Sequence, residues 1–248
     1  MKLSVIIPVR NQTEKLTRNL RESILPYFDK QGITYDILVC YDKEGESDIP
    51  GLLTALSEFP AHVKPVANEE KRGKGNGVKA GILHSDADYV LFMDADLATD
   101  LSVFDSIKPE LTHYDAFMAS RDLKGSIVNP KQTFIRRITH FGARMLIKMK
   151  FHFKQIKDTQ CGYKLFRTNI AKEMAKRQII SGFAFDVEYC YFLELNGYRI
   201  KEVACRWRND ADSTVSVNSS KSFADDLKRI KKNKKAYILT PEQKESLC

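Results

Sequence analysis

The first 120 residues alternate short apolar runs with longer amphipathic stretches. Runs rich in β-branched residues predict strands, and the amphipathic stretches between most of them predict helices. Because the runs are continuously apolar rather than alternating, we expect an α/β fold with a mainly parallel central sheet and helices on both faces. The expected strands span residues 3–9, 35–41, 63–67, 89–93 and 116–119, and the expected helices span residues 13–28, 48–59, 75–84 and 102–111.

The rest of the chain predicts mainly helices. A helix over residues 131–157 carries an apolar stripe between basic flanks, formed by Ile138, Phe141, Met145 and Met149. Further helices are expected near residues 168–176, 184–195 and 221–235, with a strand near residues 199–207. Because there is no internal repeat and no Gly/Ser linker, we expect one domain over residues 1–220, followed by a basic helix and tail over residues 221–248.

Basic residues are concentrated in one segment. The 248-residue chain has a formal net charge of +8, but residues 131–177 contain 13 Lys and Arg against 2 Asp and Glu, a net charge of +11. Such a surface suits a nucleic acid, a phosphorylated substrate or an anionic membrane. No apolar run approaches the ~18 residues of a membrane-spanning helix. The five cysteines are scattered and lack CxxC spacing, which disfavours a disulfide framework or a zinc site and indicates a reducing, cytosolic setting.

Polar residues follow the expected strands at the places where ligands collect in parallel α/β folds. They comprise Pro8, Arg10 and Asn11 after the first strand, Asp42 after the second, Asn68 and a glycine-rich loop after the third, and Asp94 with Asp96 after the fourth. Because carboxyl ends of parallel strands share an edge of the sheet, we expect these loops to converge on one rim.

Asp94 and Asp96 form a DxD pair at the end of an apolar strand. Two carboxylates separated by one residue can hold one hard divalent cation, Mg²⁺ or Mn²⁺, and leave coordination positions for substrate phosphates. The same pair is also consistent with a solvated turn or with a helix cap at Asp96 or Thr99.

Residues 71–77, with the sequence KRGKGNG, combine three glycines with basic side chains just before an expected helix. The glycines allow close backbone approach, and a helix N-terminus attracts an anion. The spacing matches neither a P-loop nor a Rossmann fingerprint. A diphosphate site and a basic surface turn are both open interpretations.

Two further segments place polar groups beside predicted elements. Residues 158–164, with the sequence DTQCGYK, read most simply as a turn with Gly162 at positive φ. Asp186 and Glu188 stand in the first turn of an otherwise apolar helix. There they complement the helix dipole, or one of them faces a substrate as a base.

The order of these motifs resembles one known family. Over roughly residues 3 to 232 the chain contains VIIPVRN, ILVCYD, NEEKRGKGNGVKAGI, DYVLFMDADLATD, MASR, DTQCGYKLF, GFAFDVEYCYF and GYRIKEVACRW. Together they resemble the family 2 glycosyltransferases of GT-A fold. The most similar branch contains the dolichyl-phosphate glucosyltransferases and mannose synthases, which move a sugar from a nucleotide diphosphate to a polyprenyl phosphate. The resemblance implies a GT-A fold and an inverting hexosyltransferase that uses Mg²⁺ or Mn²⁺.

The resemblance also implies roles for the donor side of a site. Asp94 and Asp96 match the metal-binding pair beside the donor diphosphate, and Asp96 is also expected to be catalytic. The other residues implied to bind the nucleotide sugar are Pro8, Val9, Asn11, Asp42, Lys74 and Gly75. Tyr41 replaces the first acid of the family's VDD motif, which leaves the donor base open.

On the acceptor side, Asp158 and Asp186 match catalytic acidic residues of the family. The residues implied to bind the acceptor phosphate are Arg121, Arg137, Gln160 and Lys164. Ala98 stands where mannose synthases have a glutamine that helps hold the metal, so the resemblance favours glucose as the sugar.

The expected function is transfer of a sugar, glucose favoured, from a nucleotide-diphosphate donor to a dolichyl or undecaprenyl phosphate. We expect peripheral binding to the cytosolic face of a membrane through the basic 131–157 helix, with a membrane subunit as a further candidate partner and no nucleic acid. The alternative for that helix is core packing with a solvated basic flank. The alternative functions are a transferase with a soluble or glycan acceptor and a non-enzymatic basic binding module.

Overall fold

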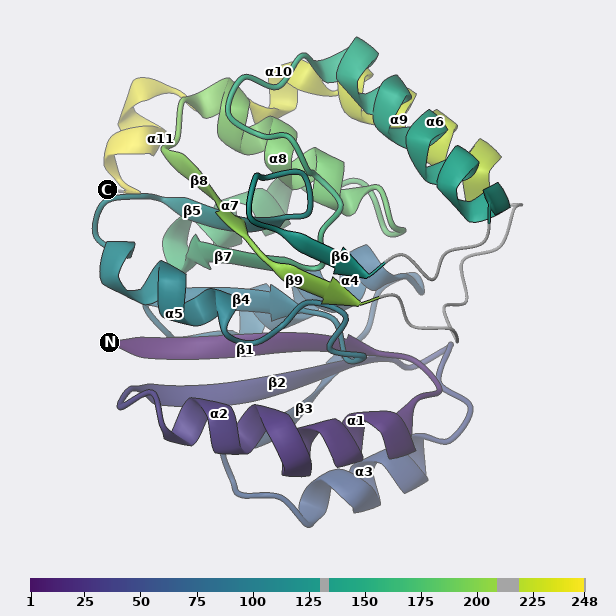
Figure 1. Cartoon of the computed structure of the whole chain (residues 1–248), viewed down its shortest axis with the longest axis vertical. Coiled ribbons are helices and arrows are strands. Elements are labelled where there is room, and N and C mark those ends of the chain that lie inside the picture. Colours follow the sequence, from purple (N-terminus) through teal and green to yellow (C-terminus); the bar gives the residue numbers. More distant parts are fainter. Residues whose placement is uncertain (130–133, 209–218, 248) are drawn as a thin grey trace.

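The computed structural model of the chain describes residues 1–129, 134–208 and 219–247. Within these ranges, the side chains of residues 134–141, 143 and 219–221 lie outside the description. Figure 1 shows a central sheet with helices on both faces and a small second sheet in front of it.

The central sheet has seven strands in the order β3-β2-β1-β4-β7-β5-β8. Strands β1 to β4 are mutually parallel, β7 is antiparallel to its neighbours β4 and β5, and β5 is parallel to β8. The small sheet is the parallel pair β6 and β9. The predicted α/β fold with a mainly parallel central sheet is confirmed. The strands are β1 Lys2–Val9, β2 Thr34–Asp42, β3 Val63–Asn68, β4 Tyr89–Met93, β5 Ala116–Ser120, β6 Ile127–Asn129, β7 Tyr163–Arg167, β8 Ile200–Ala204 and β9 Arg206–Arg208.

The helices begin close to the predicted residues, and at some of them a capping side chain marks the start. In α3, for example, Asp48 precedes the helix and its Oδ1 accepts a hydrogen bond of 2.9 Å from Gly51 N. The helices are α1 Thr13–Asn19, continued by a π-helical turn Leu20–Ile24 and by α2 Leu25–Asp29; α3 Ile49–Ser57; α4 Lys74–His84; α5 Val103–Ile107; α6 Phe134–Phe151; α7 Thr168–Arg177; α8 Phe185–Asn196; α9 Ser219–Lys232; α10 Lys234–Tyr237; and α11 Pro241–Glu245.

The structure differs from the sequence-based expectations at several places. Gly162 does not have the positive φ that was expected for the turn over residues 158–164. The strand expected over residues 199–207 divides into β8, which pairs with β5, and β9, which pairs with β6. Strand β7 lies where no strand was predicted, because Lys164 interrupts its apolar run. Helix α6 ends at Phe151 rather than near residue 157, because His152 has a φ of 49°, outside the helical region.

Side chains of the sheet point alternately into two cores. Val5 and Ile7 of β1 pack with α1, α3 and α5 on one face, whereas Ile6 packs with α4, α7 and α8 on the other. This second core also includes Leu227 of α9 and Tyr237 of α10, both buried. The domain boundary at residue 220 stays a prediction, but these contacts tie the C-terminal helices to the core of the preceding residues.

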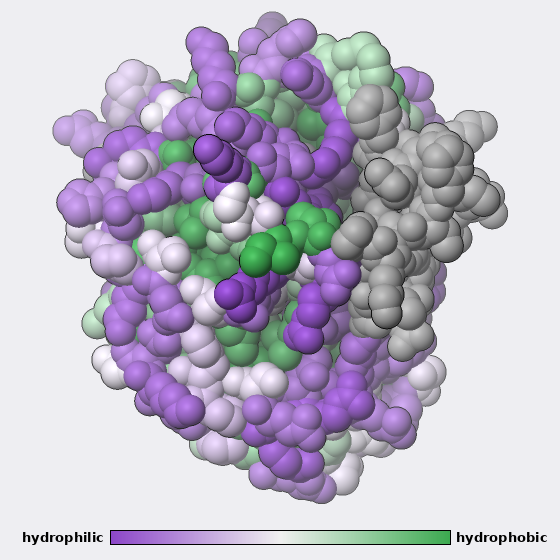
Figure 2. All heavy atoms as spheres, in the orientation of Figure 1, coloured by the Kyte–Doolittle hydropathy of each residue, from purple (hydrophilic) through white to green (hydrophobic). Residues whose placement is uncertain are grey.

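The end of α6 has one buried and one exposed apolar face. Ile147 and Phe151 are buried, whereas Met145, Leu146 and Met149 are 53%, 36% and 54% exposed. Figure 2 shows light green atoms over the upper part of α6 and a stronger green patch over the small sheet, among mostly hydrophilic surface. Within the described ranges, the helices fall short of the combined length and hydropathy that crossing a bilayer requires.

Candidate functional site

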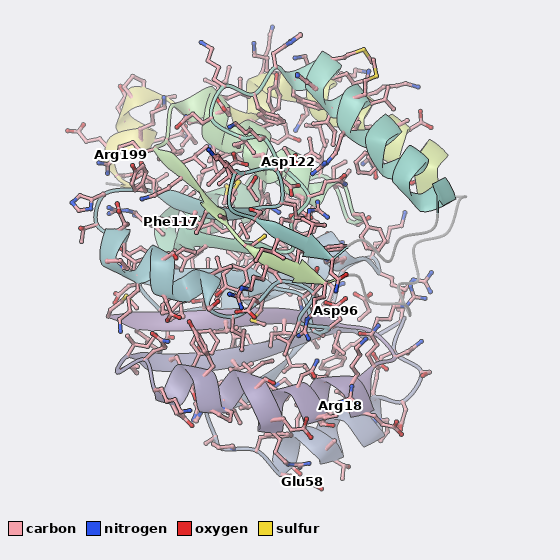
Figure 3. The ribbon with its side chains drawn as sticks, viewed as in Figure 1. Arg18, Glu58, Asp96, Phe117, Asp122 and Arg199 are labelled. Carbon is pink, nitrogen blue, oxygen red and sulfur yellow. The ribbon has the colours of Figure 1, made fainter. Side chains whose placement is uncertain are left out.

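Polar residues stand at the ends of four neighbouring parallel strands. Asn11 follows β1, while Asp42 and Asn68 end β2 and β3 and lie opposite each other in register. Asp94 follows β4, and Asp96, labelled in Figure 3, lies on the side of the sheet toward which β1 and β4 point. Because these strands are parallel, their carboxyl ends form one rim. The predicted convergence of the loops is confirmed.

Asp42 anchors the loop that follows β3. Its Oδ1 accepts a hydrogen bond of 2.7 Å from Asn68 Nδ2, and its Oδ2 accepts one of 3.2 Å from Gly73 N. The carboxylate is 8% exposed. Asp42 therefore fixes the start of the glycine-rich turn while remaining at the rim.

The loop after β1 is held by hydrogen bonds to Glu46 and Ser47. Asn11 has a φ of 51°, its backbone N donates to Glu46 Oε2 at 2.8 Å, and its Oδ1 accepts from Ser47 N at 2.8 Å. Pro8 and Val9 end β1 just before this turn, with Val9 buried. Three of the residues predicted to contact a nucleotide thus lie at the end of β1 and in the ordered turn that follows it.

The glycine turn, residues 71–77, lies directly against residues 178–183, which we call the bracing segment. Gly75 N and Asn76 N donate to Ser181 O at 2.8 and 3.4 Å. A Cβ at Gly73 would clash with Ser181 O, and a Cβ at Gly75 would clash with Ile180 O. The glycines therefore make room for protein backbone. These two amides at the start of α4 are bound to Ser181. Of the two interpretations that the sequence left open, the diphosphate site therefore cannot rest on these amides.

Lys74 begins α4, and its side chain reaches the acid pair. Lys74 Nζ lies 2.6 Å from Asp94 Oδ1, and it also lies over the rings of Phe92 and Phe183 at 5.2 and 5.7 Å. Burial acts to lower the pKa of Lys74, but the charges of Asp94 and Asp186 outweigh it and raise that pKa. The glycine turn and the acid pair therefore face each other with a charged lysine between them.

Asp96 completes the acid pair. Burial and the charge of Asp94 both raise the pKa of Asp96, whose Oδ1 accepts a hydrogen bond of 2.9 Å from Ala98 N. A Cβ at Gly162 would clash with the Asp94 carboxylate, so glycine at 162 leaves room for this pair. Among the described residues, no group of three or more His, Cys, Asp or Glu side chains is placed to hold a metal.

Lys164 and Asp186 form a buried ion pair beside the acid pair. Lys164 Nζ lies 2.5 Å from Asp186 Oδ1, and the two residues are 1% and 5% exposed. Burial acts to lower the pKa of Lys164, but Asp186 outweighs it and raises that pKa. The ammonium groups of Lys164 and Lys74 both lie within 6 Å of the Phe92 ring, at 5.9 and 5.2 Å. We call Lys74, Asp94, Lys164 and Asp186 the ionic cluster.

Asp158 forms a bidentate ion pair with Arg121. Arg121 Nε and Nη2 lie 2.7 and 2.8 Å from the two carboxylate oxygens, and Arg121 N donates to Oδ2 at 3.0 Å. Gln160 N donates to Oδ1 at 3.2 Å, and Arg144 Nη2 of α6 lies 3.6 Å from Oδ2. Burial acts to raise the pKa of Asp158, but Arg121 outweighs it and holds that pKa well below its usual range. Asp158 is therefore a fixed anion that is unsuited to accept a proton at neutral pH.

The structure gathers most of the predicted site residues at one rim. Three groups result: the turn and carboxylate around Asn11 and Asp42, the ionic cluster with Asp96, and the Arg121–Asp158 pair. Arg137 lies in α6, but its side chain lies outside the described residues. Arg144 of the same helix reaches the Arg121–Asp158 pair instead.

Sequence reasoning missed the bracing segment. Its contact with the glycine turn runs through the carbonyl of Ser181, which carries no side-chain signal. Phe183, which lies beside Lys74, is 46% exposed. A large exposed aromatic residue in a short connection between two helices was the available hint, since such residues often serve a site.

Comparison with known proteins agrees with the resemblance read from the motifs. The model of the family described as Glycosyl transferase family 2 matches residues 4–175. The chain is 31% identical over 241 residues to a dolichyl-phosphate beta-glucosyltransferase of Dictyostelium discoideum, covering 92% of this chain and 73% of that protein. It is 28% identical over 257 residues to the Saccharomyces cerevisiae protein of the same name, covering 96% and 75%.

Solved structures give the same fold. Glucosyl-3-phosphoglycerate synthase from Mycobacterium tuberculosis, in complex with Mn²⁺, uridine-diphosphate-glucose and phosphoglyceric acid, aligns with a TM-score of 0.68 at 12% identity, covering 97% of this chain and 81% of that one. At this identity the likeness concerns the fold, and it confirms the predicted GT-A architecture. The family match spans the glycine turn, the acid pair and β7. The chain therefore belongs to glycosyl transferase family 2 and is a glycosyltransferase.

Proposed function

We propose that the chain transfers glucose from a uridine-diphosphate donor to a polyprenyl phosphate, with inversion at the sugar carbon. The observation that carries the proposal is the contact between Lys74 and Asp94, which sets the glycine turn against the acid pair at the rim. The relatives named above are dolichyl-phosphate beta-glucosyltransferases, and the solved relative is a complex with uridine-diphosphate-glucose. Those names supply the sugar, the acceptor class and the donor base of the proposal.

We assign the nucleoside end of the donor to the loops after β1 and β2. Asn11 and Asp42 lie at the rim in turns held by several hydrogen bonds, so their polar groups are presented in fixed positions. Pro8 and Val9 shape the same turn, and Gly75 keeps the start of α4 close to the ionic cluster. We assign Lys74 to the diphosphate, because its charged side chain lies between the glycine turn and the acid pair.

A divalent cation, Mg²⁺ or Mn²⁺, fits the acid pair. Asp94 and Asp96 offer hard oxygen ligands. Burial raises the pKa of Asp96, and the negative charge of Asp94 adds to that rise, which a bound cation would offset. When bound, such an ion neutralises charge on the departing nucleoside diphosphate. Lys74 contributes a second positive charge on the Asp94 side, and phosphate oxygens of the donor supply the remaining ligands.

We assign the acceptor phosphate to the Arg121 side of the site. Arg121 uses Nε and Nη2 on Asp158, so we assign its Nη1 to the phosphate, with Gln160 and Arg137 as further contacts. Lys164 is 1% exposed, so it contributes positive charge from behind Asp186.

The chemistry needs no side chain to act as a base. A phosphate monoester is already an anion near neutral pH, since its second pKa is about 6. One of its oxygens attacks the anomeric carbon, the bond from that carbon to the donor phosphate breaks, and the electron pair leaves with UDP. Asp158 and Asp186 then serve by positioning Arg121 and Lys164.

The exposed end of α6 is suited to a membrane surface. Met145, Leu146 and Met149 are exposed there beside basic Lys148, whereas Arg144 of the same helix contacts the Arg121–Asp158 pair. One helix thus presents apolar and basic groups outward and touches the proposed acceptor site. We propose that it lies on the cytosolic face of a membrane, where a lipid-linked phosphate is available.

The test is release of the nucleoside diphosphate, UDP or GDP, across a panel of UDP-glucose, UDP-galactose and GDP-mannose. Each donor is assayed with Mg²⁺, Mn²⁺ or EDTA, and with polyprenyl phosphate, 3-phosphoglycerate or no acceptor. We expect turnover only with UDP-glucose, polyprenyl phosphate and a divalent ion together. Equal turnover with the soluble acceptor, or turnover unaffected by EDTA, would contradict the proposal.

A further inference from the structure

Glu188 is a buried carboxylate that the proposed chemistry does not use. It lies two residues after Asp186 in α8 and is 1% exposed. Because residues two apart lie on different sides of a helix, Asp186 faces the ionic cluster while Glu188 faces the bracing segment. Glu188 therefore does not meet a substrate as a base, which was one interpretation of the sequence.

Both carboxylate oxygens of Glu188 accept hydrogen bonds. Oε1 accepts from Ile179 N at 2.7 Å and from the hydroxyl of Tyr237 at 2.6 Å, and Oε2 accepts from Ile180 N at 3.1 Å. Two successive backbone amides of the bracing segment are thus fixed by one side chain. Hydrogen bonds from uncharged donors to a buried carboxylate are among the stronger ones in proteins.

The bracing segment passes this constraint to the glycine turn. Ser181, the residue after Ile180, accepts from Gly75 N and Asn76 N, and neither Gly73 nor Gly75 has room for a side chain against it. The two backbones are therefore in direct contact. Any shift of Ile180 moves the carbonyl that holds the start of α4.

A second set of hydrogen bonds joins the bracing segment to the glycine turn. Gln178 Nε2 donates to Ile180 O at 2.7 Å and to Asn76 Oδ1 at 3.3 Å, and the hydroxyl of Tyr189 donates to Gln178 Oε1 at 2.6 Å. Asn76 Nδ2 in turn donates to Lys71 O at 2.8 Å. The bracing segment therefore holds Asn76 near the end of the glycine turn, and Asn76 in turn holds the first residue of the turn, Lys71.

We propose that Glu188 is a positioning residue for the donor diphosphate. By fixing the amides of Ile179 and Ile180, it sets Ser181 O, and through it the glycine turn and Lys74. The inference rests on the proposed function in placing the diphosphate at that turn, and it adds a residue that touches neither substrate.

The main test is Glu188→Gln in the full chain. The glutamine has the size of the glutamate, and its oxygen still accepts hydrogen bonds from Ile179 N and from the hydroxyl of Tyr237. Its NH₂ group, however, is placed against Ile180 N, and because both groups are donors this hydrogen bond is lost. We expect the KM for UDP-glucose to rise about tenfold with kcat within about twofold, and the Kd for UDP with Mn²⁺ to rise by the same factor.

Two matched variants separate positioning from general stability. Ser85→Ala removes a buried hydroxyl that donates to Ser4 Oγ at the opposite end of α4, so it should lower the melting temperature without changing the KM. Tyr237→Phe removes one donor to Glu188 but leaves both backbone amides bound, so it should change the KM by less than about twofold. A full tenfold effect of Tyr237→Phe would overturn the assignment, because it would trace the effect to the C-terminal helices.

Hydrogen exchange tests the coupling without any nucleotide. In Glu188→Gln, peptides covering residues 71–78 and 178–183 should both exchange faster than in the wild type, while the peptide around Ser85 is unchanged. Faster exchange confined to residues 178–183, or an unchanged Kd for UDP, would overturn the inference. If the variant does not fold, the wild type decides: UDP should slow exchange in both peptides, and protection of residues 71–78 alone would contradict the coupling. Failure of the wild type to bind UDP would instead count against the proposed function.

Discussion

Lys74 Nζ and Asp94 Oδ1 lie 2.6 Å apart, and this contact joins the glycine turn to the acid pair. In the ligand-free chain the lysine is thus the counter-ion of a carboxylate that we assign to a divalent cation. Its charge is also surrounded by the rings of Phe92 and Phe183, which favour a cation over a neutral group. We therefore propose that Lys74 pairs with Asp94 until a donor and its ion bind, and that it then contacts the diphosphate.

Removing this lysine should separate its two effects. In Lys74→Met, we expect the affinity for Mn²⁺ without nucleotide to rise roughly tenfold, because a competing positive charge close to Asp94 is lost. The affinity for UDP should fall, because the diphosphate loses a cation. Isothermal titration with Mn²⁺ and with UDP measures both. Lys79→Met is the control and should change neither affinity. Lys79 lies further along the same helix, and the variant breaks its 2.7 Å ion pair with Glu70.

Asp96 offers a sharper test of the acid pair. Asp96→Asn keeps the size of the side chain but removes a charge that we assign to the metal, so UDP release should fall by at least about 100-fold. The melting temperature should change little, because the side chain makes one hydrogen bond, to Ala98 N. Asp100→Asn is the matched variant, since Asp100 lies in the same loop but caps Ser102 N. It should keep most of the turnover; metal-dependent turnover in Asp96→Asn would refute the assignment.

The strand ends of the site were predictable from the sequence because they depend on local pattern. Each apolar run of the first half stops at a polar residue, such as Asp42 or Asn68, and parallel strands bring those stops to one rim. The alternation of strands and helices also predicted the parallel strands β1 to β4. These features need no knowledge of which distant residues meet.

The parts that could not be predicted depend on long-range contacts. Strand β7 has a buried lysine at its second position, Lys164, whose charged partner is the distant carboxylate of Asp186. The sequence leaves the glycine turn open between a diphosphate site and a basic surface turn, and it gives no sign that Ser181 lies against it. Glu188 looks like a helix-dipole residue until the amides of Ile179 and Ile180 are seen to donate to it.

Asp158 predicts a pH-dependent stability. In Asp158→Asn, Arg121 loses its charged partner in a buried site, so the free energy of unfolding at pH 7 should fall by about 3 kcal/mol or more. The pKa of Asp158 is lower in the folded chain than in the unfolded chain. The stabilisation is therefore complete above the unfolded pKa, near 4, and is lost as the pH falls toward the folded value.

Urea unfolding of both proteins between pH 7 and pH 3 measures this difference. The difference in free energy of unfolding between the wild type and Asp158→Asn should be constant from pH 7 to about pH 5. Below about pH 4 the difference should shrink, because the wild type loses stability. Arg144→Met is the control, because its contact with Asp158 is longer, at 3.6 Å, and its side chain is 40% exposed. It should cost less than about 1 kcal/mol. A difference that stays constant down to pH 3 would contradict the assignment of the low pKa to the Arg121 pair.

The exposed end of α6 gives a test of the membrane interpretation. The double variant Met145→Glu and Met149→Glu replaces two apolar groups by negative charges, which an anionic lipid surface repels. Binding to vesicles containing phosphatidylserine, measured by sedimentation, should therefore weaken more than tenfold. Leu53→Glu, at a 37% exposed apolar position on α3 at the opposite end of the molecule, should bind as the wild type does (Figure 1). Turnover with a short-chain polyprenyl phosphate in detergent should survive in the double variant, because no residue of the rim is changed. Unchanged vesicle binding would show that this face of α6 does not bind the membrane surface.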